Sequence, residues 1–301
     1  MNMSHQNELV LVTGATGKQG GATARRLLAD GVRVRALVRD PQTAAARELA
    51  GLGAELAVGD FDHPTTLAAA VAGVRGVFLV PPAAFGPDGW DAELEANRGI
   101  ALIDAARTAG VEQLVFTGVA GFGTEIGWGN RGKRRIEEAA AESGLRYTLL
   151  RPVRFMENYL GLAALPLDGF RDGFHRHIFR ADRPFQMIAV DDIAAVAALA
   201  FADPDRFHGR ALDLAGDEHT PPAAAAIIGR AVGRPLGYRR LTEAEADALT
   251  ASVGDTWRLA EAGQGWQADI EAIRAIHPGL QNLETWLATT GAAQLKAVLA
   301  P

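Results

Sequence analysis

The chain has 301 residues, and 30 Lys and Arg stand against 36 Asp and Glu, so the formal net charge is −6. This length can bury a full α/β core, and the mildly acidic balance argues against a dedicated nucleic-acid surface. The sequence contains no cysteine, which excludes disulfides, thiolate nucleophiles and cysteine-ligated metals. No apolar stretch reaches the roughly 18 to 20 uncharged residues of a membrane span, and residues 1–8 lack the apolar core of a signal peptide. We therefore expect a cytoplasmic protein with neither nucleic-acid nor membrane partners.

A glycine-rich loop, GATGKQGG, begins at Gly14 after an apolar run and before a helical pattern. In such a loop Gly14 suits a tight turn, Gly17 lets a pyrophosphate approach the backbone, and Gly20 allows close helix–strand packing. An ordinary glycine-rich turn is the alternative, but the strand before and the helix after favour a dinucleotide whose phosphates lie at the helix N-terminus. The loop residues expected to bind the cofactor are Gly14, Thr16, Gly17, Lys18, Gln19 and Gly20.

The end of the second predicted strand, residues 32–38, distinguishes NADP from NAD. An NAD site usually carries an acidic side chain here, about 20 residues past the glycines, that binds the ribose hydroxyls. Arg39 stands here instead, and a guanidinium matches a 2′-phosphate. Lys18 adds positive charge in the loop unless it is simply solvated, and the adjacent Asp40 is an alternative ribose ligand. We expect NADP(H) to be preferred over NAD(H).

Strand-like and helix-like segments alternate through the first half of the chain. Candidate strands are residues 9–13, 32–38, 55–58, 76–80, 113–117 and 147–150, and candidate helices are residues 20–30, 65–71, 91–109 and 132–143. Glycines 31, 73, 110 and 144 mark helix ends. The alternation predicts an α/β fold, a doubly wound parallel sheet of the Rossmann type with a smaller C-terminal α+β lobe.

The pattern weakens after residue 151, and residues 165–184 show no clear period before a helical stretch at 191–201. We expect residues 1–155 to form the NAD(P)-binding domain and residues 186–205 to return to it. Residues 156–185 and 206–301 would then form the smaller lobe, which faces a substrate or a protein partner. The sequence does not indicate an oligomeric state.

Three further motifs accompany the glycine loop and Arg39: GDFD at residues 59–62, Lys133 at a helix start, and RPVRFMENY at residues 151–159. Together they resemble the NmrA-like family of atypical short-chain dehydrogenases/reductases over most of the chain, most strongly before residue 160. The resemblance implies a Rossmann domain with NAD(P) at the strand ends and a small lobe over the nicotinamide. Some members of the family are reductases, whereas others bind the cofactor and regulate a partner.

The resemblance also implies further cofactor contacts. Asp60 and Phe61 would lie at the adenine; Leu79, Val80 and Pro81 along the ribose; and Pro152, Val153 and Phe155 at the nicotinamide. Each has a plainer interpretation, because Asp60 also suits a turn after a strand and the apolar side chains also suit the core.

The catalytic pattern of the resembled enzymes is incomplete. Short-chain reductases usually pair a lysine with a tyrosine four positions earlier, so that the ammonium lowers the pKa of the phenol. Lys133 fits the lysine role and Thr117 replaces the usual serine, but Gly129 occupies the tyrosine position and has no proton to give. Trp128 offers only an indole N–H.

Three other proton donors remain. They are Tyr159, and His175 and His177 in the irregular residues 173–179, where a structural or solvated histidine is the alternative. This His-x-His pair lacks a recognisable third ligand, so we expect no metal site.

Two functions are consistent with these features. One is an NADPH-dependent oxidoreductase for a hydrophobic conjugated acceptor such as a quinone, enone or dye, where hydride attack needs little protonation by the protein. The other is a non-catalytic redox sensor that binds NADPH or NADP and regulates a partner protein. The missing tyrosine favours the sensor, but hydride transfer can also proceed by positioning and electrostatics alone.

Overall fold

The computed structural model describes residues 8–82, 84–86, 89–123, 130–161 and 167–300. The chain divides into two compact units, each described by itself: unit 1 is residues 1–119, 129–151 and 193–212, and unit 2 is residues 120–128, 152–192 and 213–301. The division predicted from the sequence differs at its edges. It gave residues 120–128, 152–155 and 186–192 to the first unit and residues 206–212 to the second.

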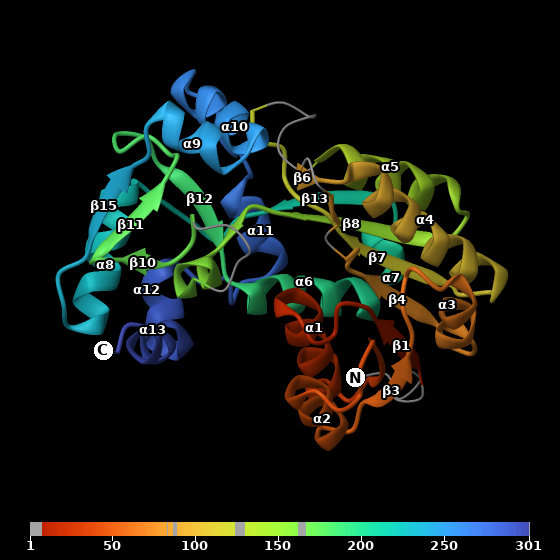
Figure 1. Cartoon of the computed structure of the whole chain (residues 1–301). Coiled ribbons are helices and arrows are strands. Elements are labelled where there is room, and N and C mark those ends of the chain that lie inside the picture. Colours follow the sequence, from red (N-terminus) through yellow and green to blue (C-terminus); the bar gives the residue numbers. More distant parts are fainter. Residues whose placement is uncertain (1–7, 83, 87–88, 124–129, 162–166, 301) are drawn as a thin grey trace. The chain divides into compact units, whose positions relative to one another are not determined.

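Unit 1 is built on a seven-stranded sheet with the order β13-β8-β7-β4-β1-β2-β3 (Figure 1). Its strands are β1 (Leu9–Val12), β2 (Arg33–Val38), β3 (Glu55–Val58), β4 (Gly76–Leu79), β7 (Gln113–Thr117), β8 (Arg146–Pro152) and β13 (Arg210–Leu214). Every neighbouring pair from β8 to β3 is parallel. The predicted doubly wound sheet is therefore confirmed, and β13 is the one strand of this sheet that the periodicity did not indicate.

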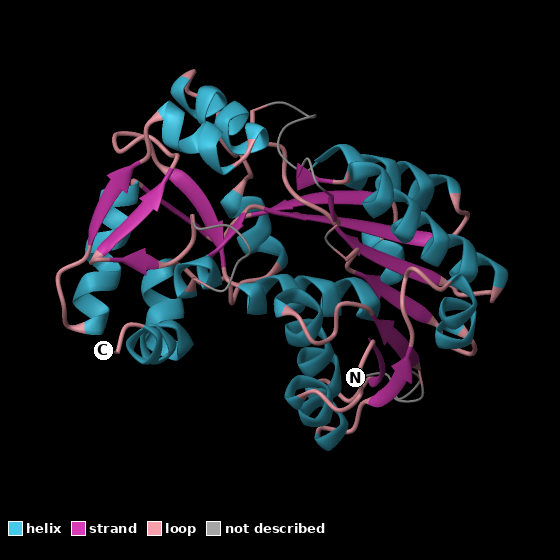
Figure 2. Cartoon of the chain, in the orientation of Figure 1, coloured by secondary structure: helices cyan, strands magenta, loops and turns pink. Residues whose placement is uncertain are grey.

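Helices cover both faces of this sheet (Figure 2). They are α1 (Lys18–Ala29), α2 (Ala44–Gly51), α3 (Pro64–Val71), α4 (Ala92–Thr108), α5 (Asn130–Glu142), α6 (Val190–Ala202) and the short α7 (Pro204–Phe207), with a small hairpin of β5 (Phe85–Gly86) and β6 (Gly89–Trp90) before α4. Leu67 of α3, Leu102 of α4 and Ile136 of α5 share one fully buried cluster with strand residues. On the sheet's other face, Gln113 donates to the Ala200 carbonyl of α6 at 2.7 Å.

Unit 2 contains two three-stranded sheets. One has the order β10-β11-β15, from β10 (Phe170–Arg171), β11 (Phe174–His177) and β15 (Gly237–Arg240); the other has the order β14-β12-β9, from β9 (Arg154–Phe155), β12 (Phe185–Ile188) and β14 (Asp217–His219). Its helices are η2 (Met156–Leu160), α8 (Pro221–Val232), α9 (Glu243–Leu249), α10 (Ala251–Glu261), α11 (Ile270–Ile276), α12 (Leu283–Trp286), η3 (Leu287–Gly291) and α13 (Ala292–Val298). Residues 174–177, expected to be irregular, form the strand β11.

Among the described residues, no helix combines the length and the apolar composition that a membrane crossing requires.

The first turn of α1 lies against the end of β1. A Cβ at Gly20 would lie 2.3 Å from the Gly14 carbonyl oxygen and 2.4 Å from that of Thr13, so the helix approaches the strand at a distance that any side chain forbids. The obstacles are backbone atoms, which cannot rotate away.

We expect Gly20→Ala to lower the free energy of unfolding by about 2–3 kcal/mol, at the upper end of overpacking costs. Gly51→Ala, at the end of α2 where a Cβ meets open space, is the matched control and should be neutral or slightly stabilising. Urea unfolding of both variants measures the difference. Equal stability of the two variants would contradict the packing argument.

Candidate functional site

The strand order of unit 1 reverses between β1 and β4, and in such sheets ligands bind at the carboxyl ends of the strands beside the reversal. Thr13 joins these two strand ends. Its hydroxyl accepts a hydrogen bond from the Val80 N–H at 2.8 Å and donates to the Val80 carbonyl at 3.0 Å. Val80, predicted to lie beside the ribose, is therefore held at the glycine loop.

The glycine loop is a tight turn in which the Gly17 N–H donates to the Gly14 carbonyl at 2.8 Å. Gly14 has a φ of +58°, and a Cβ on it would lie 3.1 Å from the Val80 Cβ. The exposed residues Gly14, Thr16 and Gly17 form the outer side of the turn, and Gly20 lies beneath it. The loop thus presents backbone rather than side chains at the switch point, which is the surface a pyrophosphate requires.

Helix α1 starts directly after Gly17, which is its N-cap and supplies no side-chain hydrogen bond to the first turn. No acidic residue lies in that first turn. The N–H groups of a helix start and the positive end of its dipole favour an anion. The backbone of the Gly14–Gly20 loop and the start of α1 together form a cradle that fits the diphosphate of a dinucleotide.

Arg39 follows β2 at the same edge of the sheet and is exposed. Its guanidinium has no ion pair among the residues that the structure describes. Asp40, the alternative ribose ligand, instead accepts a hydrogen bond from the Gln42 N–H at 2.7 Å and so closes a local turn. The Arg39 guanidinium is therefore available to a ligand, whereas the Asp40 carboxylate is hydrogen-bonded to the backbone.

The GDFD motif forms the turn after β3. The Asp60 carboxylate accepts from the Asp62 N–H at 3.0 Å, so the turn interpretation of Asp60 holds in this structure. Phe61 is buried in the core cluster, as is Leu79. Asp62 pairs with Arg98 at 2.6 and 2.7 Å, and these hydrogen bonds lower the pKa of the carboxyl. Adenine contact by this motif stays a prediction.

Lys133 lies in a buried ion pair that the sequence did not indicate. Its Nζ is 2.5 Å from Glu95 Oε1 of α4, and Glu95 is only 1 % exposed. Trp90 donates to the other oxygen of Glu95 at 3.1 Å, and the ammonium lies 4.4 Å from the centre of the Trp90 ring. Burial lowers the pKa of Lys133, and the attraction of Glu95 opposes that shift.

The helix crossing explains this pair. A Cβ at Gly132 would lie 2.5 Å from the Ala92 carbonyl oxygen, so α4 and α5 meet closely beside Lys133. Gly129, at the position of the expected tyrosine, and Trp128 lie outside the described residues.

Thr117 ends β7 and is also engaged, because its hydroxyl donates to Gln19 Oε1 at 2.7 Å. This contact joins the predicted carbonyl-polarising residue to the glycine loop. Both predicted catalytic residues of unit 1 therefore have protein partners.

The RPVRFMENY segment contributes mainly to structure. Arg151 binds the buried Glu137 of α5 through two hydrogen bonds of 2.9 and 2.6 Å. Glu157 accepts from the Val190 N–H at the start of α6 and from the Trp286 indole at 3.0 Å, and burial raises its pKa to about 7. The charged residues of the motif thus hold together segments far apart in the chain.

Three residues predicted to face the nicotinamide belong to unit 2 and are described within it. Pro152 accepts a hydrogen bond from the Ala120 N–H, and the buried Val153 donates from its N–H to the Leu214 carbonyl. Phe155 of β9 is half-buried and pairs with Ile188 of β12. Their contact with a cofactor stays a prediction.

His175 and His177 are fully buried in unit 2 beside Arg154. The Arg154 guanidinium lies 3.3 Å from His177 Nε2 and 3.4 Å from His175 Nε2, and it pairs with Asp168 at 2.7 Å. Burial, then the positive charge of Arg154, lowers the pKa of both histidines well below the usual range. They are structural, neutral side chains, and the arginine between them would repel a metal cation.

Tyr159 packs in the same cluster, 1 % exposed, with its ring 5.0 Å from that of His175. Burial raises the pKa of its phenol. A buried phenol that resists ionisation is poorly suited to donate a proton to a substrate.

We expect acid to destabilise the fold through these histidines. Their folded-state pKa lies below the unfolded value of about 6.5, so at these two sites the unfolded chain binds more protons, and their contribution to stability falls as the pH drops below about 6.5. Glu157, whose pKa is raised to about 7 by burial, contributes a slope of the opposite sign, so the histidine contribution is measured by comparing variants. Each histidine contributes a slope of about 1.4 kcal/mol per pH unit. Urea unfolding at several pH values between 7.5 and 5.5 measures this slope.

The variant His177→Gln should show a shallower slope than the parent chain, whereas His63→Gln, at an exposed histidine, should keep the parent slope. A slope unchanged in His177→Gln would show that the buried imidazole takes up a proton as readily as the unfolded one.

Comparison with known proteins gives concordant results. The model of the NmrA-like family matches residues 6–256. The chain is 33% identical over 262 residues to the NAD(P)H azoreductase of Xenophilus azovorans, covering 84% of each chain. The NADPH-dependent quinone oxidoreductase QOR2 of Escherichia coli, solved with NADPH, superimposes with a TM-score of 0.71 at 25% identity, covering 93% of this chain and 98% of that one. NmrA, a negative transcriptional regulator solved with NADP, has a TM-score of 0.78 at 20% identity over 97% and 98% of the two chains, a likeness of fold.

Proposed function

Because the chain belongs to the NmrA-like family, we propose that it is an NADPH-dependent oxidoreductase that reduces a hydrophobic conjugated acceptor. The observation that carries this proposal is the cradle at the switch point of unit 1, where the Gly14–Gly20 loop and the uncapped start of α1 meet. The azoreductase and quinone oxidoreductase relatives support acceptors of the dye and quinone type.

The preference for NADPH rests on Arg39. This exposed guanidinium is available for a 2′-phosphate, whereas Asp40 is held in its own turn. Lys18, the first residue of α1, adds a second positive charge at the loop. A phosphate monoester needs such charge-assisted partners, and a ribose hydroxyl does not.

The bound cofactor supplies a hydride, that is, one hydrogen with two electrons. The Thr117 hydroxyl donates to Gln19 and the Lys133 ammonium pairs with Glu95, so we assign a proton transfer to neither side chain. The residues of this chain position the reactants and stabilise charge. Reduction of a quinone requires one further proton, which we assign to water. Conjugated acceptors spread the incoming charge over several atoms, so they depend less on an acid placed by the protein.

The alternative function is an NADPH sensor without turnover. The burial of Tyr159, His175 and His177 favours it, since it removes three titratable groups from the set of proton donors. The fold shared with the regulator NmrA is consistent with it.

We expect NADPH to bind at least tenfold more tightly than NADH, because a charge-assisted pair with phosphate contributes about 1.5 to 3 kcal/mol. Arg39→Asp should abolish the difference. Arg33→Asp makes the same charge change at the exposed opposite end of β2 and should preserve it. Calorimetric titration of both cofactors provides the dissociation constants, and equal values for the unmodified protein would refute the assignment.

Turnover is tested by NADPH oxidation with 1,4-naphthoquinone, cyclohexenone and an azo dye, beside a cofactor titration. We expect oxidation with at least the quinone, and Tyr159→Phe should stay within severalfold of the parent rate, because removal of a true general acid costs about 10²–10⁴-fold. NADPH binding without turnover on any acceptor would favour the sensor. A loss of three orders of magnitude in Tyr159→Phe with intact cofactor affinity would identify the phenol as the acid.

A further inference from the structure

Unit 2 contains a pocket lined by aromatic rings. Its volume is about 170 Å³, and its lining includes Phe122, Phe179, Phe185 and Trp266 together with Arg180 and Arg183. For scale, an engineered apolar cavity of about 150 Å³ binds benzene. The pocket therefore has room for one aromatic ring, and larger ligands would extend out of it.

The rings stand at fixed angles to one another. Phe122 and Trp266 meet edge-on, with ring centres 5.0 Å apart at 84°, and Phe179 meets Trp266 at 5.7 Å and 66°. Phe179 stacks on Phe185 at 4.8 Å. The rings make these contacts with one another, so a planar aromatic guest would lie in the pocket beside this cluster and not between its members.

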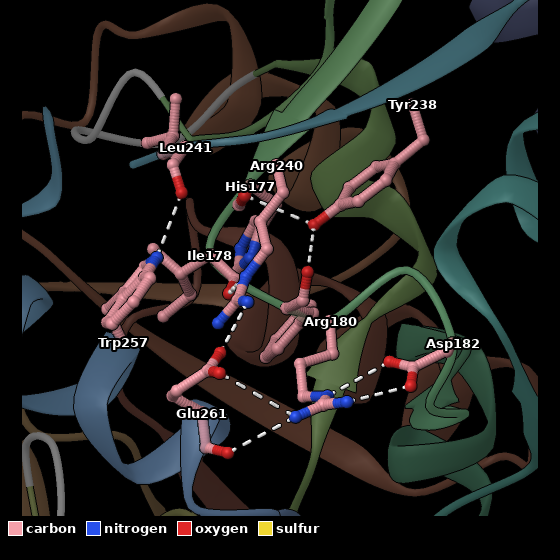
Figure 3. Close-up of polar contacts among 10 residues, drawn as sticks. His177, Ile178, Arg180, Asp182, Tyr238, Arg240, Leu241, Trp257 and Glu261 are labelled. Carbon is pink, nitrogen blue, oxygen red and sulfur yellow. Dashed lines mark hydrogen bonds and ion pairs between the residues drawn. The ribbon is translucent and has the colours of Figure 1, made fainter. Parts of the chain in front are cut away.

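The backbone of residues 177–179 is held by Tyr238 and Arg240 of β15 (Figure 3). The Tyr238 hydroxyl oxygen lies 2.5 Å from the Phe179 carbonyl oxygen and 3.1 Å from that of His177, so its one proton is shared between them, and Arg240 donates to the Ile178 carbonyl at 3.0 Å. Three consecutive carbonyls are thus held by two side chains of β15. The position of the ring is set before any ligand arrives.

The loop that carries Trp266 is held in place as well. The buried Gln186 donates to the Ala268 carbonyl at 2.9 Å and accepts from the Ala268 N–H at 2.8 Å, which fixes the loop that carries Trp266. A Cβ at Gly123 would lie 2.4 Å from the Gln264 Cβ, so the chain beside Phe122 touches this loop. Both segments of the lining are therefore held in advance, as in most ligand sites.

The polar groups of the pocket include an unmatched donor. The Trp266 indole nitrogen is buried and has no hydrogen-bond partner within the described part of the chain. Leaving such a donor unpaired costs about 1–3 kcal/mol. A ligand that carries an acceptor beside its ring would remove this cost.

Of the two arginines that line the pocket, Arg183 has no carboxylate partner among the described residues. Arg180 binds Asp182 through two hydrogen bonds of 2.9 and 2.8 Å, and these lower the pKa of that carboxyl to about 2, so the pair stays ionised. Glu261 pairs with Arg240 at 2.6 Å and lies 3.7 Å from Arg180 (Figure 3). Arg183 is exposed and makes no ion pair with any residue that the structure describes.

We propose that this pocket binds an aromatic ring that bears an acidic substituent, a sulfonate or a carboxylate. The ring lies in the pocket against the cluster of Phe122, Phe179 and Trp266, and the acidic group pairs with the Arg183 guanidinium and accepts from the Trp266 N–H. The inference also names a substrate class for the enzyme, aromatic acceptors that bear an acidic group. That part rests on the proposed oxidoreductase function.

Binding is tested first, with no turnover required. Calorimetry on the full chain, with and without saturating NADPH, compares benzenesulfonate with benzenesulfonamide, which has the same ring and no charge. We expect benzenesulfonate to bind at least threefold more tightly. Arg183→Gln should weaken benzenesulfonate binding about threefold to tenfold, the range of a partly exposed charge-assisted pair.

Trp266→Phe retains a ring and removes the indole N–H, so it should also weaken benzenesulfonate more than benzenesulfonamide. Arg230→Gln removes an exposed guanidinium on α8 away from the pocket lining and is the control that should leave the affinity unchanged. Equal affinity of the two ligands, or an Arg183→Gln variant that binds benzenesulfonate as the parent does, would overturn the proposal.

Kinetics then separate the pocket from the proposed function. With 1,2-naphthoquinone and its 4-sulfonate as acceptors, we expect a lower KM for the sulfonate and a smaller KM difference in Arg183→Gln. Absence of turnover with both quinones would overturn the oxidoreductase function alone, because the benzenesulfonate titration decides the pocket separately. Turnover with equal KM values would overturn the substrate class and leave the oxidoreductase in place.

Discussion

The separation between the first turn of α1 and the end of β1 constrains the rest of unit 1. Backbone carbonyls of Thr13 and Gly14 occupy the space that a Cβ of Gly20 would need, so the helix can lie directly on the strand. That approach directs the start of α1 at the carboxyl edge of the sheet. The hydrogen bonds from Thr13 to Val80 then align β4 with this edge. The backbone surface of the candidate phosphate site therefore depends on one steric condition, the absence of a Cβ at Gly20.

Sequence analysis predicted correctly those elements of the fold that short-range sequence patterns mark. The glycine loop, the strand segments and the helix-ending glycines are marked by residues close in sequence, and the four glycines 31, 73, 110 and 144 all have positive φ. Strand β13 was missed because its sequence RALDL alternates weakly and its place beside β8 depends on long-range pairing. Strand β11, with the sequence FHRH, was missed because histidines occupy its two buried positions and its one apolar residue, Phe174, is exposed.

The partners of the charged residues were beyond the reach of sequence analysis. Glu95 looks like an ordinary acidic residue in the first turn of α4, and only the crossing of α4 and α5 at Gly132 buries it against Lys133. In the same way, the Arg154 side chain gave no sign that it would lie between His175 and His177. Charge pairing of this kind is decided by tertiary packing, which leaves no periodicity in the sequence.

Buried charged pairs occur in both units, Glu95 with Lys133 in unit 1 and Arg154 with Asp168 in unit 2. Unit 1 presents its candidate cofactor site through backbone, whereas unit 2 is organised by side chains such as Glu157, Arg154 and Gln186, each fixing a strand, a helix start or a loop. Replacing one partner of a buried pair leaves the other uncompensated at a cost of about 3–5 kcal/mol, so a substitution at such a residue lowers stability whatever the site does. Residues at the rim are under no such constraint. Arg183 is one of these, since its exposed guanidinium can be exchanged without breaking a described contact. A substitution at this rim position therefore leaves the buried network of unit 2 unchanged.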